Sequence, residues 1–289
     1  MFMRYIKNMT AYNPNSNLDL PWFETNEISK LDTISSKYKE AAHSYHYKGY
    51  CVLDTDISEE LVDEVNDGIF DHLKKDNPKL NPKFYHYNSS PRIIEAWKHI
   101  PGIVSLSNNK NVLEFLELMY EKKPLPFSTI NFLRGSEQPL HSDYMHFSSK
   151  PERYLCGVWF ALEDIHADSG PLVVIAGSRD LPIVTIDDLG LEVPKNNKQL
   201  KSNYTIYEEA VKSIVEENNL AKESITIKKG QCLIWAANTL HGGSATNDPS
   251  LTRKSLVVHY HFSGCEYYNP GFSSFKNNQV AKRTLEVIK

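Results

Sequence analysis

The chain changes character at about Lys123. Beyond that point, short runs rich in Val, Ile, Tyr, Phe and Trp follow one another, separated by Gly, Pro, Asp and Ser. The runs span residues 127–135, 139–147, 153–162, 170–178, 223–237 and 253–262. Runs of this kind are typical of antiparallel strands. Because they follow a mostly helical region, they favour an α+β fold with a β-sandwich or β-barrel core.

The region before Lys123 is predicted to be mostly helical. Its clearest helix, over 57–75, carries an apolar stripe formed by Leu61, Val62, Val65, Ile69 and Phe70. Further helices are expected over 26–48, 93–100, 111–120 and 207–221, with a short strand over 50–54. The first 30 residues are polar and irregular, and we expect this arm to dock through Leu20, Trp22 and Phe23.

Length favours one domain over the 289 residues. We expect a mostly helical part over 1–122, a β core over 123–265 with an insertion at about 180–222, and a C-terminal tail over 266–289.

Composition excludes several classes of protein. The net charge is −4, so no global basic field is available for nucleic acid. The four cysteines form no CxxC pair, which argues against zinc ribbons, and they are too few for a disulfide scaffold. The chain has no stretch of 18 apolar residues and no long apolar segment at its start. We therefore expect a cytoplasmic protein without a membrane span; its oligomeric state is left open.

His141 and Asp143 are the first candidate site residues. They stand two positions apart in the run 139–147, so in a strand their side chains lie on one face. An imidazole and a carboxylate side by side form two members of a facial metal triad. Because an HxD triplet also arises by chance, a third ligand is needed.

His241 and Arg253 supply the remaining features. His241 ends a β-rich run about 100 residues after His141, where a jelly-roll can bring the two together, although a turn histidine is the alternative. Arg253 begins the last run and shares a face with Ser255, Val257, His259 and His261. If that face is buried, the guanidinium requires an anion, and a carboxylate suits its planar fork. A solvated or salt-bridged arginine is the alternative.

These residues stand in stretches that resemble the phytanoyl-CoA dioxygenase family. The stretches are QPLHSDYMHF (138–147), GVWFALEDIHADSGPLVVIAGSRDLP (157–182) and LHGGSATNDPSLTRKSL (240–256). The resemblance covers roughly residues 125–262 and implies a double-stranded β-helix (jelly-roll) with N-terminal helices packed on one sheet. It implies Fe(II) held by His141, Asp143 and His241, with 2-oxoglutarate as cosubstrate. It also implies that Arg253, with Ser255, binds the distal carboxylate of 2-oxoglutarate.

The resemblance implies a reaction with O2 and a small molecule. Halogenating relatives have a small residue at the position of Asp143, so the carboxylate favours hydroxylation, or desaturation, over halogenation, with release of succinate and CO2. A small polar metabolite, a sugar or an acyl derivative is the expected substrate. Two departures from the family pattern, Arg179 in place of a histidine and Gly243 in place of a hydroxyl residue, bear on the substrate and on groups around the metal.

Several assignments stay open at this point. Thr129 and Asn131 share one face of their run and are expected to contact 2-oxoglutarate or the substrate if that face is inward. His259 and His261 could instead serve as ligands of a cupin-like metal-dependent isomerase, and a non-catalytic jelly-roll that binds a small ligand is a further alternative. The loop 76–92, which contains Phe84, Tyr85 and Tyr87, is predicted to cover the mouth of the β core.

Overall fold

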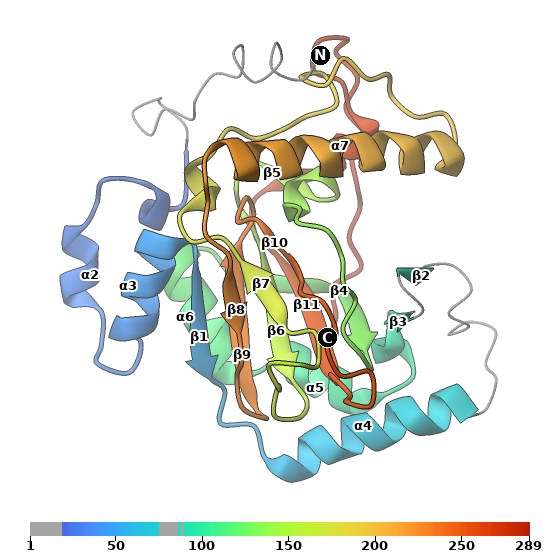
Figure 1. The fold of residues 1–289 in the computed structure, drawn as a ribbon. Coiled ribbons are helices and arrows are strands. Elements are labelled where there is room, and N and C mark those ends of the chain that lie inside the picture. Colours follow the sequence, from blue (N-terminus) through green and yellow to red (C-terminus); the bar gives the residue numbers. More distant parts are fainter. Residues whose placement is uncertain (1–18, 75–85, 88–89) are drawn as a thin grey trace.

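The computed structural model describes residues 19–74, 86–87 and 90–289. It combines helices with β-sheets, as the sequence predicts (Figure 1). Most of the loop predicted to cover the β core, including Phe84 and Tyr85, lies outside the described residues. That prediction stays a prediction.

A seven-stranded antiparallel sheet runs through the molecule in the order β1-β9-β6-β11-β4-β3-β2. Its strands are β1 (Tyr50–Asp54), β2 (His86–Tyr87), β3 (Ser90–Ile94), β4 (Pro124–Phe132), β6 (Leu155–Ala161), β9 (Gln231–Ala236) and β11 (Ser255–Phe262). A three-stranded sheet has the order β10-β7-β8, with β7 (Leu172–Val174), β8 (Glu223–Ile225) and β10 (His241–Gly243). The strands β5 (Ser148–Lys150) and β12 (Glu266–Tyr268) form a separate pair.

Helices from the first half of the chain cover one face of the large sheet (Figure 1). They are α2 (Ser29–Thr33), α3 (Lys39–Lys48), α4 (Glu59–Lys74), α5 (Pro101–Ser107) and α6 (Lys110–Tyr120). Their apolar side chains form one buried cluster with side chains from β1, β6, β9 and β11. The later helix α7 (Asn197–Glu217) lies across one end of the sheets (Figure 1).

Alternation along β11 separates the two sides of the large sheet. Leu256, Val258 and Tyr260 belong to the cluster that contains the helices. Val257 packs instead with Leu172 of β7, in a second cluster between the two sheets. Because successive side chains of a strand point to opposite faces, the odd-numbered residues of β11 face the small sheet. This side of the large sheet carries the candidate site.

The predicted loop 76–92 is wrong in its last part, where β2 and β3 begin. Three predicted helices are also wrong in part. The predicted helix over 93–100 is divided, since residues up to Ile94 belong to β3 and Glu95 has a left-handed backbone (φ 56°) before a single turn at Ala96–Lys98. The predicted helix over 26–48 is also divided, into α2 and α3. The later helix begins at Asn197 rather than 207, because the Asn196 side chain accepts a hydrogen bond from the backbone of Gln199.

The described part of the N-terminal arm, from residue 19 onward, docks as expected. Leu20, Trp22 and Phe23 are buried, and the Phe23 ring lies 4.8 Å from that of Tyr45 and 5.0 Å from that of Tyr120, measured between centroids. Within the part of the chain that the structure describes, no helix is long and apolar enough to cross a membrane.

Replacing Phe23 by alanine should lower the free energy of unfolding by about 3–5 kcal/mol, because a fully buried ring leaves a cavity. Urea denaturation measures the change. The matched control is Phe70→Ala on α4, where the side chain is 57% exposed, and its cost should stay below about 1 kcal/mol. Equal losses for the two variants would contradict a docked arm.

Candidate metal centre

Two backbone hydrogen bonds join His141 to His241. The amide of each residue donates to the carbonyl of the other, both at 2.9 Å. His241 opens β10, but the strand predicted over 139–147 is wrong, because His141 makes only an isolated bridge. The chain then turns at Asp143–Met145, and the Ser142 hydroxyl accepts from the amide of Tyr144 at 3.1 Å. The turn, and not strand alternation, orients Asp143.

His141, Asp143 and His241 bring their donor atoms together. One ligand atom from each lies within 4.8 Å of the others, and all three side chains are buried. Among the described residues this is the one group of histidine, cysteine and acidic side chains with such geometry. His241 Nε2 lies 3.8 Å from Asp143 Oδ1, too far for a hydrogen bond but suitable for two atoms that share an ion.

Backbone carbonyls fix both imidazole rings. His141 Nδ1 donates to the carbonyl of Pro139 at 2.9 Å, and His241 Nδ1 donates to that of Thr239 at 3.0 Å. A carbonyl only accepts, so each Nδ1 carries the proton and each Nε2 keeps its lone pair. Outer hydrogen bonds of this kind orient the imidazoles that bind metals. Gln138 Nε2 lies 3.1 Å from His141 Nε2.

The three donors have the protonation states that a divalent cation requires. Burial lowers the pKa of His141 well below its ordinary value, and it lowers the pKa of His241. Burial alone would raise the pKa of Asp143, but the imidazoles of His259 and His241 outweigh it and hold that pKa far below its usual range. Two neutral imidazoles and one carboxylate therefore stand together in a buried place.

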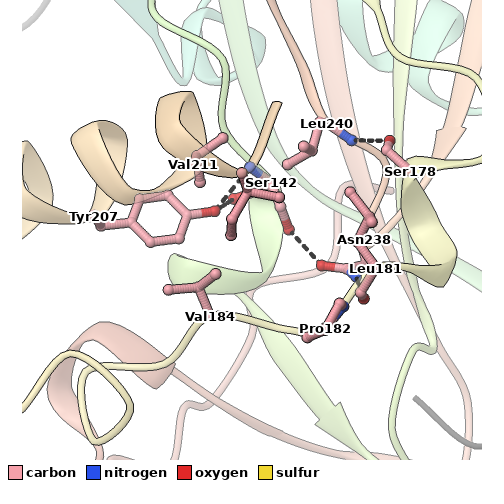
Figure 2. A pocket seen from close by; sticks show the side chains of 10 residues that line it. Ser142, Ser178, Leu181, Pro182, Val184, Tyr207, Val211, Asn238 and Leu240 are labelled. Atoms are coloured by element: carbon pink, nitrogen blue, oxygen red, sulfur yellow. Dashed lines mark hydrogen bonds between the residues drawn. The ribbon is translucent and has the colours of Figure 1, made fainter. Parts of the chain in front are cut away.

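A polar network supports the turn from behind (Figure 2). The backbone amide of Ser142 donates to the hydroxyl of Tyr207, on α7, at 2.9 Å. The Ser142 hydroxyl donates to the carbonyl of Ala237 at 3.1 Å and to Asn238 Oδ1 at 3.2 Å. A small pocket between α7 and the segment from Ser178 to Val184 lies beside these groups (Figure 2). Sequence reasoning missed Tyr207, which stands far from every ligand in the chain. It also missed Asn238, which stands three residues before His241 but acts through a contact with the distant Ser142.

Arg253 is buried without a carboxylate partner among the described residues. Its side chain is 2% exposed, and its guanidinium makes only long hydrogen bonds, to the carbonyls of Gly170 at 3.3 Å and Arg134 at 3.4 Å. Phe132 and Trp159 flank it, with ring centroids 5.3 and 5.4 Å from Cζ. Burial, assisted by Arg92, lowers its pKa to about 10, so it stays charged at neutral pH.

The structure brings Ser255 to this side of the sheet but not Thr129 or Asn131. Ser255 lies opposite Phe132, which packs between the sheets. Asn131 lies opposite Leu256 and Ile93, both in the cluster on the helix side, and Thr129 lies opposite Val258 of the same cluster. Cross-strand partners share a face. The side chains of Thr129 and Asn131 therefore point away from the donor cluster, contrary to the sequence expectation.

His259 lies near the cluster, but neither His259 nor His261 joins it. His259 Nε2 is 3.4 Å from Asp143 Oδ2. The His261 ring is stacked on Phe127 at 4.1 Å and lies 3.6 Å from the ring of Tyr267, between centroids. Neither belongs to the group of donor atoms found among the described residues, which disfavours the cupin-like ligand set.

Comparison with protein families identifies the class. Residues 106–254, just over half of the chain, match the family model described as phytanoyl-CoA dioxygenase. The chain belongs to the phytanoyl-CoA dioxygenase family. A probable phytanoyl-CoA dioxygenase of Caenorhabditis elegans is 23% identical over 221 residues, which are 74% of this chain and 65% of that protein. Across the curated relatives that it matches, the chain spans between 39% and 65% of their length.

Solved structures share the fold. The α-ketoglutarate-dependent carbocyclase SnoK from nogalamycin biosynthesis is similar with a TM-score of 0.63 and 14% identity, over 89% of this chain and 95% of that one. EctD from S. alaskensis, solved with 2-oxoglutarate and 5-hydroxyectoine, has a TM-score of 0.63 and 17% identity, over 91% and 86%.

The metal-free protein should lose stability as the pH falls from about 7 to 5.5. The unfolded chain protonates His141 and His241 near pH 6.5, whereas burial lowers the pKa of both in the fold, so unfolding takes up protons in this range. Urea denaturation in the presence of a chelator measures the loss of stability.

The double variant His141→Gln/His241→Gln should show a flatter dependence on pH over the same range. Wild type and variant should run parallel above pH 7.5, where the imidazoles are neutral in both states. The same slope below pH 6.5 in the two proteins would contradict buried neutral imidazoles.

Proposed function

We propose that this protein is an Fe(II)- and 2-oxoglutarate-dependent dioxygenase that hydroxylates a C–H bond of a small molecule. The observation that carries the proposal is a pair of buried charged features on the same side of the large sheet, each of which requires a partner of opposite charge. The His141, Asp143 and His241 cluster carries a negative charge that calls for a cation, and Arg253 carries a positive charge that calls for an anion.

The donor set fits a ferrous ion. Two imidazoles and one carboxylate on one side of a metal are the donors of non-haem Fe(II) oxygenases, and they leave coordination positions open. A buried carboxylate that no cation accompanies is costly, so a divalent ion would relieve the cost. His141 Nε2, His241 Nε2 and Asp143 Oδ1 are the atoms that would hold it.

Arg253 fits the distal carboxylate of 2-oxoglutarate. Its two hydrogen bonds are long, and its Nε has no partner among the described residues. The guanidinium can therefore donate two parallel hydrogen bonds to a carboxylate. The rings of Phe132 and Trp159 hold the guanidinium in place. Ser255, fully buried on the same side of the sheet, is proposed as a second donor to this carboxylate.

The bound iron supplies the redox chemistry that couples O2 to the decarboxylation of 2-oxoglutarate, with succinate and CO2 as coproducts. The chain's own groups prepare the site. Pro139 and Thr239 carbonyls hold the two imidazoles, and the sheets exclude water from the donors. One oxygen atom of O2 enters the substrate and the other enters succinate.

Hydroxylation is the proposed outcome, with desaturation as the alternative. Halogenating relatives have a small residue where this chain has Asp143, which argues against halogenation. The proposed substrate is a small polar metabolite, a sugar or an acyl derivative. The curated relatives are named for an acyl-CoA thioester, whereas the similar solved structures are named for, or contain, other small molecules. One fold therefore serves several reactions.

Anaerobic titration tests the proposal directly. The protein should bind Mn(II), and 2-oxoglutarate should bind more tightly once the metal is present. With Fe(II) and O2, it should convert 2-oxoglutarate to succinate and CO2, faster with a substrate than without. Metal-independent binding of 2-oxoglutarate without turnover would indicate a binding protein instead, and metal binding without 2-oxoglutarate would favour a cupin-like isomerase.

Arg253→Ala should weaken 2-oxoglutarate binding at least about 10-fold, because it removes a charge-assisted pair worth roughly 1.5–3 kcal/mol. Arg253→Lys keeps the charge but loses the fork, so its affinity should fall between those of the wild type and the alanine variant. Mn(II) affinity without cosubstrate should be nearly unchanged in both variants. Calorimetric titration measures all three affinities, and equal 2-oxoglutarate affinity in all three proteins would show that Arg253 is structural.

A further inference from the structure

Trp235 and His259 both lie against one oxygen of the Asp143 carboxylate. Trp235 Nε1 donates to Oδ2 at 2.7 Å, and His259 Nε2 lies 3.4 Å from the same atom. The other oxygen, Oδ1, is the one nearest His241 Nε2, at 3.8 Å. The two carboxylate oxygens therefore have different surroundings.

We propose that Trp235 and His259 are positioning residues that hold Oδ2 so that Asp143 offers Oδ1 alone to the metal. This inference rests on the proposed function, since it concerns the same site. A carboxylate that binds through both oxygens takes two coordination positions, whereas one that binds through a single oxygen takes one. With two imidazoles, a single oxygen leaves three positions of an octahedral shell, enough for a chelating keto acid and O2.

The large sheet is built around this contact. Gly157 of β6 lies directly opposite Trp235 of β9 on one side and His259 of β11 on the other. A Cβ at Gly157 would lie 2.2 Å from Trp235 Cζ2 and 2.3 Å from Cε2, distances that real Cβ atoms do not show. The indole therefore lies against Gly157, where any larger residue would collide with the ring. Its N–H reaches Asp143 because the middle strand carries no side chain there.

Burial makes the contact selective. Trp235 is 1% exposed, and its ring also packs against that of His241, with centroids 4.5 Å apart. An indole N–H donates and cannot accept, so it holds one carboxylate oxygen against the ring and fixes the orientation of the carboxylate group. Groups that orient a metal's ligands typically change metal affinity 10- to 100-fold when they are removed.

Trp235→Phe tests the inference, because it keeps a ring and removes the N–H. Its affinity for Mn(II), measured by calorimetry without cosubstrate, should fall roughly 10- to 100-fold. The matched control is Trp22→Phe in the cluster that contains the helices. Trp22 is also buried, and its Nε1 donates to the carbonyl of Leu118, away from the donors, so the variant loses an indole hydrogen bond while Mn(II) affinity should be unchanged.

A pair of variants tests His259. His259→Leu removes the donor and should weaken Mn(II) binding, whereas His259→Gln places an amide N–H at a similar reach and should restore most of the affinity. A loss of the same size in both variants would overturn the positioning role of His259. Gly157→Ala, which displaces the indole, should reproduce the effect of Trp235→Phe.

Failure of this inference is distinguishable from failure of the proposed function. Wild-type protein that binds no Mn(II) would overturn both. Wild-type binding with unchanged affinity in Trp235→Phe would overturn the inference alone. Thermal unfolding of each metal-free variant establishes that it folds, and if Trp235→Phe does not, the two His259 variants decide the question.

Discussion

The reciprocal backbone hydrogen bonds between His141 and His241 are the constraint on which the candidate site depends. They join segments 100 positions apart in the chain and set two imidazoles side by side, with ring centroids 4.5 Å apart. The approach is close because glycines follow His241. A Cβ at Gly242 would lie 2.7 Å from the carbonyl oxygen of Gln138, and one at Gly243 would lie 2.7 Å from the amide of Glu137. The backbone thus positions the two donors before any side chain does.

Charge gives the site its second constraint. Asp143 and Arg253 are both buried and opposite in sign, yet they form no ion pair with each other among the described residues. A fold that needed only stability would have paired them or replaced them with apolar groups. Elsewhere the chain does pair buried charges, since Arg153 contacts Glu24 at 2.7 Å with both side chains 1% exposed. The separation of Asp143 from Arg253 is therefore informative, because a cation with an anionic chelator would satisfy both.

The residues of the site could be predicted from the sequence more readily than the local structure that carries them. Alternation predicts which residues of β11 share a face, and it predicts that Thr129 and Asn131 share one. Which side of the sheet that face occupies depends on the register between β4 and β11. That register comes from long-range pairing that periodicity does not contain. The sequence predicts a strand at His141 and Asp143, whereas the structure has a turn there. Side chains two positions apart can lie on the same side in either conformation, so their spacing does not distinguish the two. The role of Trp235 could not be predicted from the sequence either, since it depends on Gly157 in the neighbouring strand β6.

The groups that hold the candidate donors come from a limited part of the chain. The imidazoles are held by carbonyls two residues before each ligand, Asp143 by a side chain of β9, and the turn between the ligands by Tyr207 of α7. Each of these contacts lies behind or beside the donors and uses backbone groups or buried rings. Surfaces farther from the donors are then free to vary without disturbing the metal's surroundings. This division gives a physical reason why one fold can serve several reactions.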